Sequence, residues 1–203
     1  MFELKSPGKI FLLGEYACIA GGPALVSAIA PSYSLSVTKS EDGKVHFPVE
    51  IAPASPAGVF LLQHIKDFSG LRLKWNDPSA TSMGTGSSSA QFLLSVLALA
   101  KIQNKPEPKP AEVLELYWRI VGESQGLRPS GLDLLAQLAN ATVVAKNSPE
   151  VVVEKISPWS AQKSGAGFLL AFTGAKVKTH DHLVSLKARG FPEKFTKNIS
   201  ALN

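Results

Sequence analysis

A glycine- and serine-rich stretch followed directly by an apolar segment is the part of this chain best suited to chemistry. Residues 81–90 read Thr-Ser-Met-Gly-Thr-Gly-Ser-Ser-Ser-Ala, and residues 91–100 are mostly apolar and predict a buried helix. The first N–H groups of a helix have no partners within it, and the helix dipole places partial positive charge there. Glycines at such a junction let an anion approach the backbone. The junction predicts a phosphate site, with a flexible Gly/Ser linker as the alternative.

The residues expected to bind phosphate are those of the loop and the start of the helix: Gly84, Thr85, Gly86, Ser87, Ser88 and Ser89. Serine and threonine hydroxyls suit phosphate oxygens or a hydrated Mg²⁺. The loop is not the common P-loop, because no Gly-Lys-Ser/Thr sequence closes it.

Four motifs in a fixed order give this loop a context. They are Pro7-Gly-Lys-Ile-Phe-Leu-Leu-Gly-Glu-Tyr16 with Gly21-Gly-Pro-Ala-Leu25, the loop at 84–90, Pro129-Ser-Gly-Leu-Asp133, and Phe172-Thr-Gly-Ala-Lys-Val-Lys-Thr179. Together they resemble the signatures of the GHMP family of small-molecule kinases, which includes galactokinase, homoserine kinase, mevalonate kinase and phosphomevalonate kinase. The resemblance is closest to the last two. Thr85 and Ser89 depart from the family's usual Gly-Leu-Gly-Ser-Ser-Ala-Ala loop.

The resemblance implies an ATP- and Mg²⁺-dependent kinase that phosphorylates mevalonate or phosphomevalonate, a step in isoprenoid precursor synthesis. It implies that Asp133 is the catalytic carboxylate beside the acceptor hydroxyl. Lys9 would lower the pKa of that hydroxyl or steady phosphate charge. Ser88 would bind Mg²⁺, with Ser87 and Ser89 as near alternatives. From the residues alone, Asp133 is equally an acidic residue favoured in the first turn of a helix, and Lys9 is an ordinary strand lysine.

Other site residues follow from the same resemblance. Glu123 is a second candidate Mg²⁺ ligand, although it is equally a solvated residue at the end of a helix. The expected substrate-binding residues are Glu15, Tyr16, Ser130, Gly131 and Thr179. Tyr16 favours a phosphomevalonate-type enzyme and Pro129 a mevalonate-type enzyme, so the sequence leaves the acceptor open between the two.

The order of elements predicts an α+β fold. The family resemblance implies a GHMP kinase N-terminal lobe, of the ribosomal protein S5 domain 2-like type, at residues 1–160, and a partial second, ferredoxin-like lobe at 167–203. Strands are expected at 2–5, 8–13, 32–38, 44–47 (paired with 32–38) and 71–75, with a hairpin at 141–145 and 151–155 and a short apolar element at 24–29. Helices are expected at 56–68, 87–102 and 111–122, and a buried strand at 168–172 with helices at 180–189 and 192–202 is expected to finish the chain.

The family's third glycine-rich signature is missing from this sequence. A non-catalytic nucleotide-binding or assembly protein derived from such a kinase is therefore the competing interpretation. An incomplete second lobe would expose the apolar strand at 168–172 and the helix residues Leu183, Val184 and Leu186. We expect a homodimer to cover them.

Composition narrows the remaining function classes. The chain has 203 residues, 45% of them hydrophobic, and its one cysteine, Cys18, suits a reducing cytoplasm. No run is long enough to span a membrane, so no membrane partner is expected. The net charge of +5 arises within residues 163–203. Because those charges are singly spaced without aromatic platforms, we expect a small-molecule substrate and no nucleic-acid partner.

Overall fold

Two long antiparallel strands run through the part of the chain that the computed structural model describes, which is residues 1–78, 84–125, 129–147, 150–156 and 170–171. Strand β1 (Phe2–Leu13) pairs along its length with β2 (Ala24–Lys39). The other edge of β2 is shared: β3 (Leu71–Asn76) pairs with its C-terminal half, and β4 (Thr142–Lys146) with its N-terminal half. Strand β5 (Val152–Lys155) extends the sheet beyond β4.

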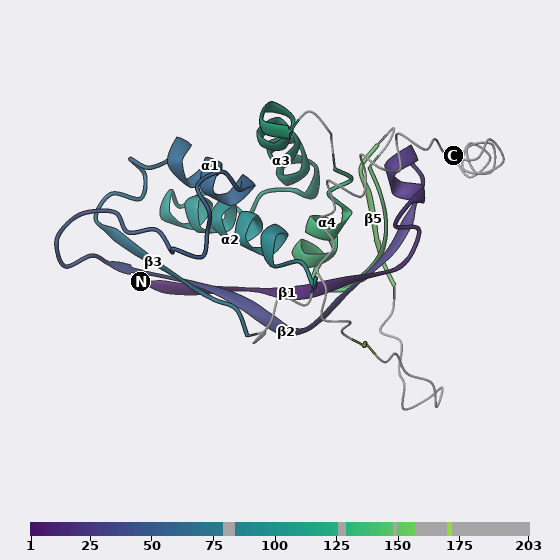
Figure 1. Cartoon of the computed structure of the whole chain (residues 1–203), viewed down its shortest axis with the longest axis horizontal. Coiled ribbons are helices and arrows are strands. Elements are labelled where there is room, and N and C mark those ends of the chain that lie inside the picture. The colour runs from purple at the N-terminus through teal and green to yellow at the C-terminus, as the bar shows by residue number, and fades with distance from the viewer. Residues whose placement is uncertain (79–83, 126–128, 148–149, 157–169, 172–203) are drawn as a thin grey trace.

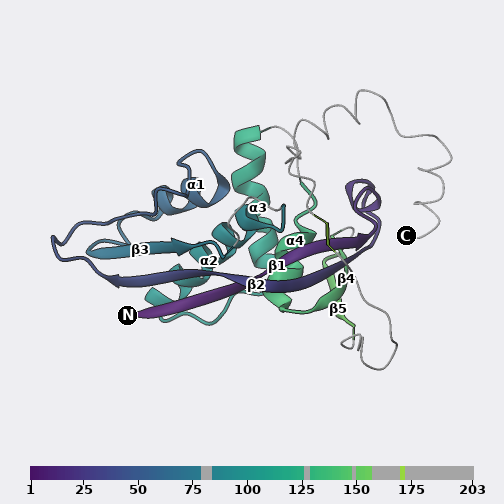
Figure 2. The ribbon, with the colours of Figure 1, turned by 60° about the horizontal axis from the view of Figure 1, so that its bottom comes forward.

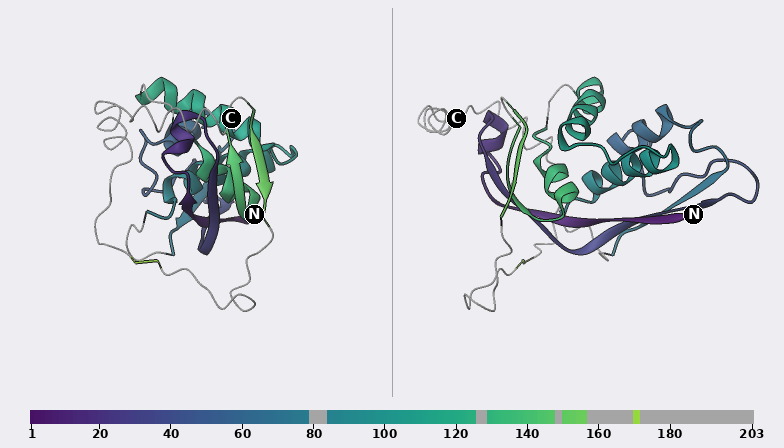
Figure 3. Two further views of the ribbon diagram at one scale, coloured as in Figure 1. Left: turned by 90° about the vertical axis from the view of Figure 1, so that its right-hand side faces the viewer. Right: turned by 180° about the vertical axis from the view of Figure 1, so that it is seen from behind.

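The described helices cover one face of this sheet (Figure 1). They are α1 (Pro56–Gln63), α2 (Ser87–Ile102), α3 (Pro110–Gln125) and α4 (Leu132–Ala139). A short 3-10 helix, η1 (Ala17–Ala20), lies in the connection between β1 and β2. Figure 2 shows β1 and β2 side by side, with α2 and α4 passing behind them. The sheet curves towards the helices at the end formed by β4 and β5 (Figure 3).

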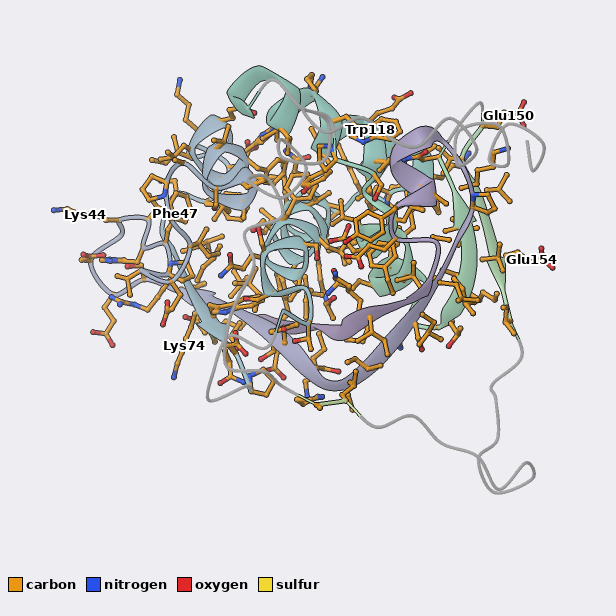
Figure 4. The ribbon with its side chains drawn as sticks, turned by 45° about the vertical axis from the view of Figure 1, so that its right-hand side comes forward. Lys44, Phe47, Lys74, Trp118, Glu150 and Glu154 are labelled. Carbon is orange, nitrogen blue, oxygen red and sulfur yellow. The ribbon has the colours of Figure 1, made fainter. Side chains whose placement is uncertain are left out.

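Side-chain alternation explains why the sheet has one dry face. On β3, Leu73 and Trp75 are buried against the helices, whereas Arg72 and Lys74 are exposed on the opposite face. Figure 4 shows Lys74 pointing away from the helices. Successive strand residues point to opposite faces, so this pattern fixes which face packs.

The core consists of two clusters that correspond to the two halves of β2. One packs α1 and α2 on the C-terminal half of β2 and on β3, with Phe60, Phe68 and Phe92 among its buried side chains. The other joins η1, α4 and β4 on the N-terminal half of β2. The start of α2 and the helix α4 meet above the middle of β1, near the boundary of the clusters (Figure 1).

The α+β architecture is confirmed, as are the strand at 71–75, the helix at 87–102 and the hairpin at 141–145 and 151–155. The predicted strands 2–5 and 8–13 are one strand, whose pairing with β2 shifts register between Pro7 and Gly8. The segments 24–29 and 32–38 likewise form one strand.

Two predicted details are wrong. The segment 44–47 does not pair with 32–38, because β1 and β3 already occupy both edges of that part of β2; instead His46 forms an isolated bridge to Arg72. The helix predicted at 56–68 ends at Gln63. The chain then turns so that Phe68 enters the core, with no exposed surface.

The C-terminal predictions fall almost wholly outside the described residues. Of the strand predicted at 168–172, residues 170 and 171 are described, and Leu170 is 54% exposed rather than buried. The predicted helices at 180–189 and 192–202, and the surface expected to dimerise, lie outside the described residues. In the parts of the chain that are described, no helix has the length and apolarity to cross a membrane.

Candidate active site

The glycine-rich loop ends in an uncapped helix start. Gly84 and Gly86 both have positive φ angles, 72° and 89°, and Gly86 is the N-cap of α2 without a side-chain cap. The first helical hydrogen bond runs from the Ala90 N–H to the Gly86 carbonyl, at 2.9 Å. The N–H groups of the three serines between them therefore have no partner within the helix. This is the local geometry that binds an anion.

Thr85 anchors this loop to the sheet. Its carbonyl accepts a hydrogen bond from the Lys9 N–H at 2.8 Å. Its hydroxyl is 2.6 Å from the hydroxyl of Tyr33, which is 2% exposed on β2. The Thr85 side chain is thus engaged with the sheet, and its hydrogen bond to Tyr33 holds the loop against β2.

The three serines at the start of α2 differ in what their hydroxyls do. Ser89 is buried, and its hydroxyl donates to the Gly86 carbonyl at 2.9 Å. Ser87 is half-buried and Ser88 is exposed. Neither hydroxyl has a hydrogen-bond partner among the described residues. The geometry therefore leaves Ser87 and Ser88 as the side chains able to contact phosphate or a metal ion.

A polar pocket adjoins this helix start. It has a volume of about 380 Å³ and is lined by Glu50, Trp75, Asn76, Asp77, Ser87 and Gln91. Five of these six residues were not among the predicted site residues. Trp75 and Asn76 end β3, and Asp77 follows them directly; their closeness in sequence to the loop is the signal that points to them.

Asp133 lies in the first turn of α4 and is half-buried. Its charge affects the pKa of two nearby groups, the partly buried Tyr117 and the buried Cys18. Burial raises the pKa of the Tyr117 hydroxyl, and Asp133 raises it further. Burial also raises the pKa of the Cys18 thiol; the Ser130 hydroxyl opposes this rise, and the charges of Asp133 and Glu15 add to it. The carboxylate therefore lies where side chains from η1, α3 and the segment before α4 converge.

The segment before α4 is held by hydrogen bonds to its carbonyls. Trp118 of α3, labelled in Figure 4, donates from its indole nitrogen to the Pro129 carbonyl at 2.8 Å. Asn147 donates to the Ser130 carbonyl at 2.7 Å. Gly131 is the N-cap of α4 with φ of 70°, and a Cβ there would overlap the Leu114 side chain. Gly131 thus sets the start of the helix that carries Asp133.

Lys9 approaches the loop from β1. A Cβ added to Gly86 would lie 2.7 Å from Lys9 Cγ, so the lysine stem runs alongside the loop. The ammonium group lies over the Phe11 ring, 5.0 Å from its centroid. Within the described part of the chain, the ion pairs do not include one between Lys9 and Asp133. Lys9 therefore lies beside the glycine-rich loop rather than bonded to the Asp133 carboxylate.

Gln137 joins the loop to the helix of Asp133, and no pattern in the sequence pointed to this residue. Its side-chain nitrogen donates to the Pro7 carbonyl at 2.9 Å and to the Gly86 carbonyl at 3.1 Å. Gln137 is one helical turn after Asp133, so the two residues lie on the same face of α4. This amide ties α4, which carries Asp133, to the glycine-rich loop and to β1.

The remaining predicted residues are more scattered. Glu15 and Tyr16 are exposed just before η1, and the Glu15 carbonyl accepts from the Cys18 thiol at 3.0 Å. Glu123 is in the last turn of α3, but its side chain and the whole of Thr179 lie outside the described residues.

The donor set fits a nucleotide better than it fits a metal ion alone. Free N–H groups and two hydroxyls at a helix start suit a triphosphate. Among the described residues, no three His, Cys, Asp or Glu side chains gather closely enough to hold a metal. A Mg²⁺ ion here would depend on the Ser88 hydroxyl, a carboxylate from outside this loop, and the phosphates themselves.

Several solved structures with a similar fold are named as small-molecule kinases. The chain is similar to the mevalonate kinase of Methanococcus jannaschii (19% identity, TM-score 0.59), covering 77% of this chain and 56% of that one. It is similar to the phosphomevalonate kinase of Streptococcus pneumoniae (19% identity, TM-score 0.58), covering 72% of this chain and 50% of that one. It is also similar to the galactokinase of Lactococcus lactis (17% identity, TM-score 0.59), covering 76% of this chain and 47% of that one.

These similarities establish the fold. The described domain has the fold of the GHMP kinases, and the chain spans about half the length of the solved structures it matches. No family model matches the sequence, and no curated protein matches it.

Proposed function

We propose that this chain acts as a GHMP-type kinase, which binds ATP at the start of α2 and transfers its terminal phosphoryl group to a small acceptor beside Asp133. The observation that carries the proposal is the uncapped start of α2, linked through Gln137 to the helix of Asp133. A kinase needs these two parts, an anion site and a carboxylate near the acceptor, to be close together.

The described residues would bind the two parts of the nucleotide at neighbouring places, the start of α2 and the polar pocket beside it. The phosphates would lie on the N–H groups of residues 87–89 and the hydroxyls of Ser87 and Ser88. Because Ser87 also lines the polar pocket, the ribose and base would lie there. Mg²⁺, held by Ser88 with Glu123 as the second proposed ligand, would neutralise phosphate charge.

The proposed reaction needs a group that accepts a proton and a group that stabilises phosphate charge. The acceptor oxygen bonds to the terminal phosphorus, the bond from that phosphorus to the bridging oxygen breaks, and ADP leaves. Asp133 would accept the proton of the acceptor hydroxyl. The Lys9 stem already runs along Gly86, and its flexible end would carry the ammonium from the Phe11 ring towards the phosphate charge.

For the acceptor we propose mevalonate or phosphomevalonate, in a cytoplasmic route to isoprenoid precursors. The support is the motif resemblance, with Glu15, Tyr16, Ser130, Gly131 and Thr179 as proposed substrate-binding residues. A galactokinase has the same fold with a comparable TM-score, 0.59. The acceptor must therefore be determined by assay.

A panel of acceptors tests the proposal. Purified protein with ATP and Mg²⁺ is incubated separately with mevalonate, phosphomevalonate, galactose and homoserine, and ADP release and phosphorylated product are measured. We expect product with mevalonate or phosphomevalonate. Glu154→Gln, a charge removal on exposed β5 (Figure 4), should leave turnover unchanged and is the matched control for Asp133→Asn. ATP binding without turnover on any acceptor would favour the nucleotide-binding or assembly role instead.

A further inference from the structure

One buried amide links three segments that lie far apart in the sequence. Gln137 of α4 is 2% exposed, and its side-chain nitrogen donates to Pro7 of β1 at 2.9 Å and to Gly86 at 3.1 Å. The same nitrogen would lie 3.1 Å from a Cβ placed on Gly86. Gln137 is thus in direct contact with the N-cap of α2 and with the strand that carries Lys9.

These bonds fix the orientation of the amide group. Both carbonyls can only accept, so the Gln137 nitrogen must face them and its oxygen must face the other way. That oxygen, Oε1, is buried and has no hydrogen-bond partner among the described residues. A buried acceptor without a donor is unfavourable. The side chain is therefore held in this position at the expense of some stability, which suggests a role other than stability.

The Gly86 carbonyl is the group on which this amide acts. It accepts from Gln137, from the Ser89 hydroxyl at 2.9 Å and from the Ala90 N–H at 2.9 Å. In a trans peptide the carbonyl and the next N–H point in opposite directions. Fixing the Gly86 carbonyl therefore directs the Ser87 N–H out of the helix start, towards a bound anion.

We propose that Gln137 is a positioning residue for the nucleotide phosphates. It holds the Gly86–Ser87 peptide in the orientation that presents the Ser87 N–H, and it sets the distance between the phosphate loop and the helix of Asp133. This inference rests on the proposed function, because it assumes that phosphate binds at the start of α2. Gln137 itself does not contact the nucleotide, since its free oxygen is buried.

The proposal predicts different effects on binding and on stability. Gln137→Leu removes two hydrogen bonds but also removes the buried acceptor that has no donor, and the two changes offset each other. We therefore expect the urea midpoint to stay close to that of the parent chain. The affinity for ADP should fall at least tenfold, because the Gly86 peptide loses one of its three restraints. The affinity for adenosine, which has no phosphates, should change less than twofold.

The experiment measures the dissociation constants of ADP and adenosine by titration calorimetry for the parent, Gln137→Leu and a control. Gln103→Leu is the matched control: its amide donates to Asp67 at 3.0 Å just beyond the C-terminal end of α2, away from the loop. The control should keep both affinities. Gln137→Glu, which turns an acceptor towards two carbonyls, should lose ADP binding more completely than Gln137→Leu.

The outcomes separate this inference from the proposed function. A parent chain that binds no ADP overturns the proposed function and the inference with it. A parent that binds ADP, together with a folded Gln137→Leu that binds it equally well, overturns the inference alone. Equal weakening of ADP and adenosine would also overturn it, because the effect would not act through the phosphates. Should Gln137→Leu fail to fold, Gln137→Met takes its place, and failure of both would assign Gln137 to the core.

Discussion

The space beside Gly86 distinguishes it from Gly84, and a pair of alanine substitutions measures the difference. Both glycines have positive φ, 89° and 72°, so either alanine costs about 1–2 kcal/mol of backbone strain. At Gly84 a Cβ would meet no atom of the described residues within 4 Å. At Gly86 it would lie 2.7 Å from Lys9 Cγ and 3.1 Å from the Gln137 nitrogen, an overpacking that costs about 1–3 kcal/mol more.

We therefore expect Gly86→Ala to lower the free energy of unfolding by about 1–3 kcal/mol more than Gly84→Ala does. Urea unfolding followed by circular dichroism measures both values. In a Lys9→Ala background most of the excess should disappear, because the closest atom has been removed. Gly86→Ala should also weaken ATP binding at least tenfold, since Lys9 and Gln137 are displaced together. Equal stability losses for the two alanines would refute the packing described here.

Two further predictions concern the hydroxyl and thiol groups buried near the site. Tyr33→Phe keeps the ring stacked on Trp75, at 5.5 Å between centroids, but removes the hydrogen bond to Thr85. Urea unfolding should show that the free energy of unfolding falls by about 0.5–1.5 kcal/mol. An unchanged urea midpoint would mean that this bond does not hold the loop. Burial raises the pKa values of Cys18, Tyr33 and Tyr117 above their ordinary values of 9.0 for the thiol and 10.0 for the phenols. As pH rises, these groups therefore lose their protons in the unfolded chain before they do so in the folded chain. Their contribution to the free energy of unfolding is fully present below about pH 9 and is lost as pH rises beyond it. The loss is about 1.4 kcal/mol per pH unit for each group that ionises only on unfolding. Urea midpoints between about pH 8 and pH 11 measure this fall, which Tyr33→Phe should make shallower, and a flat profile would contradict it.

The parts of the site that could be predicted are those made by neighbours in sequence. The loop and α2 follow each other directly, so glycine positions, serine hydroxyls and apolar periodicity predict both the helix start and its free N–H groups. The hairpin of β4 and β5 was predictable for the same reason. Local chemistry determines these features, and tertiary packing leaves them unchanged.

The parts that could not be predicted depend on contacts between distant segments. The hydrogen bond from Gln137 to Pro7 joins residues that are 130 apart in the sequence, and nothing in the composition of either segment predicts it. The engagement of Thr85 with Tyr33, 52 residues away, likewise depends on how β2 passes beneath the loop. The pairing of 44–47 failed because an alternating pattern cannot tell which edges of a strand its neighbours already occupy.

In the proposed reaction, a phosphoryl group passes from ATP at the start of α2 to an acceptor beside Asp133. Its most direct test is a single-turnover experiment, with enzyme in excess over ATP labelled in the terminal phosphate, in the presence of the acceptor chosen by the panel. For the parent chain we predict transfer of the label to the acceptor. For Asp133→Asn we predict a rate at least about 10²-fold lower with ATP affinity nearly unchanged. Transfer at the parent rate in a folded Asp133→Asn, or tight ATP binding by the parent with no transfer to any acceptor, would contradict the proposed reaction.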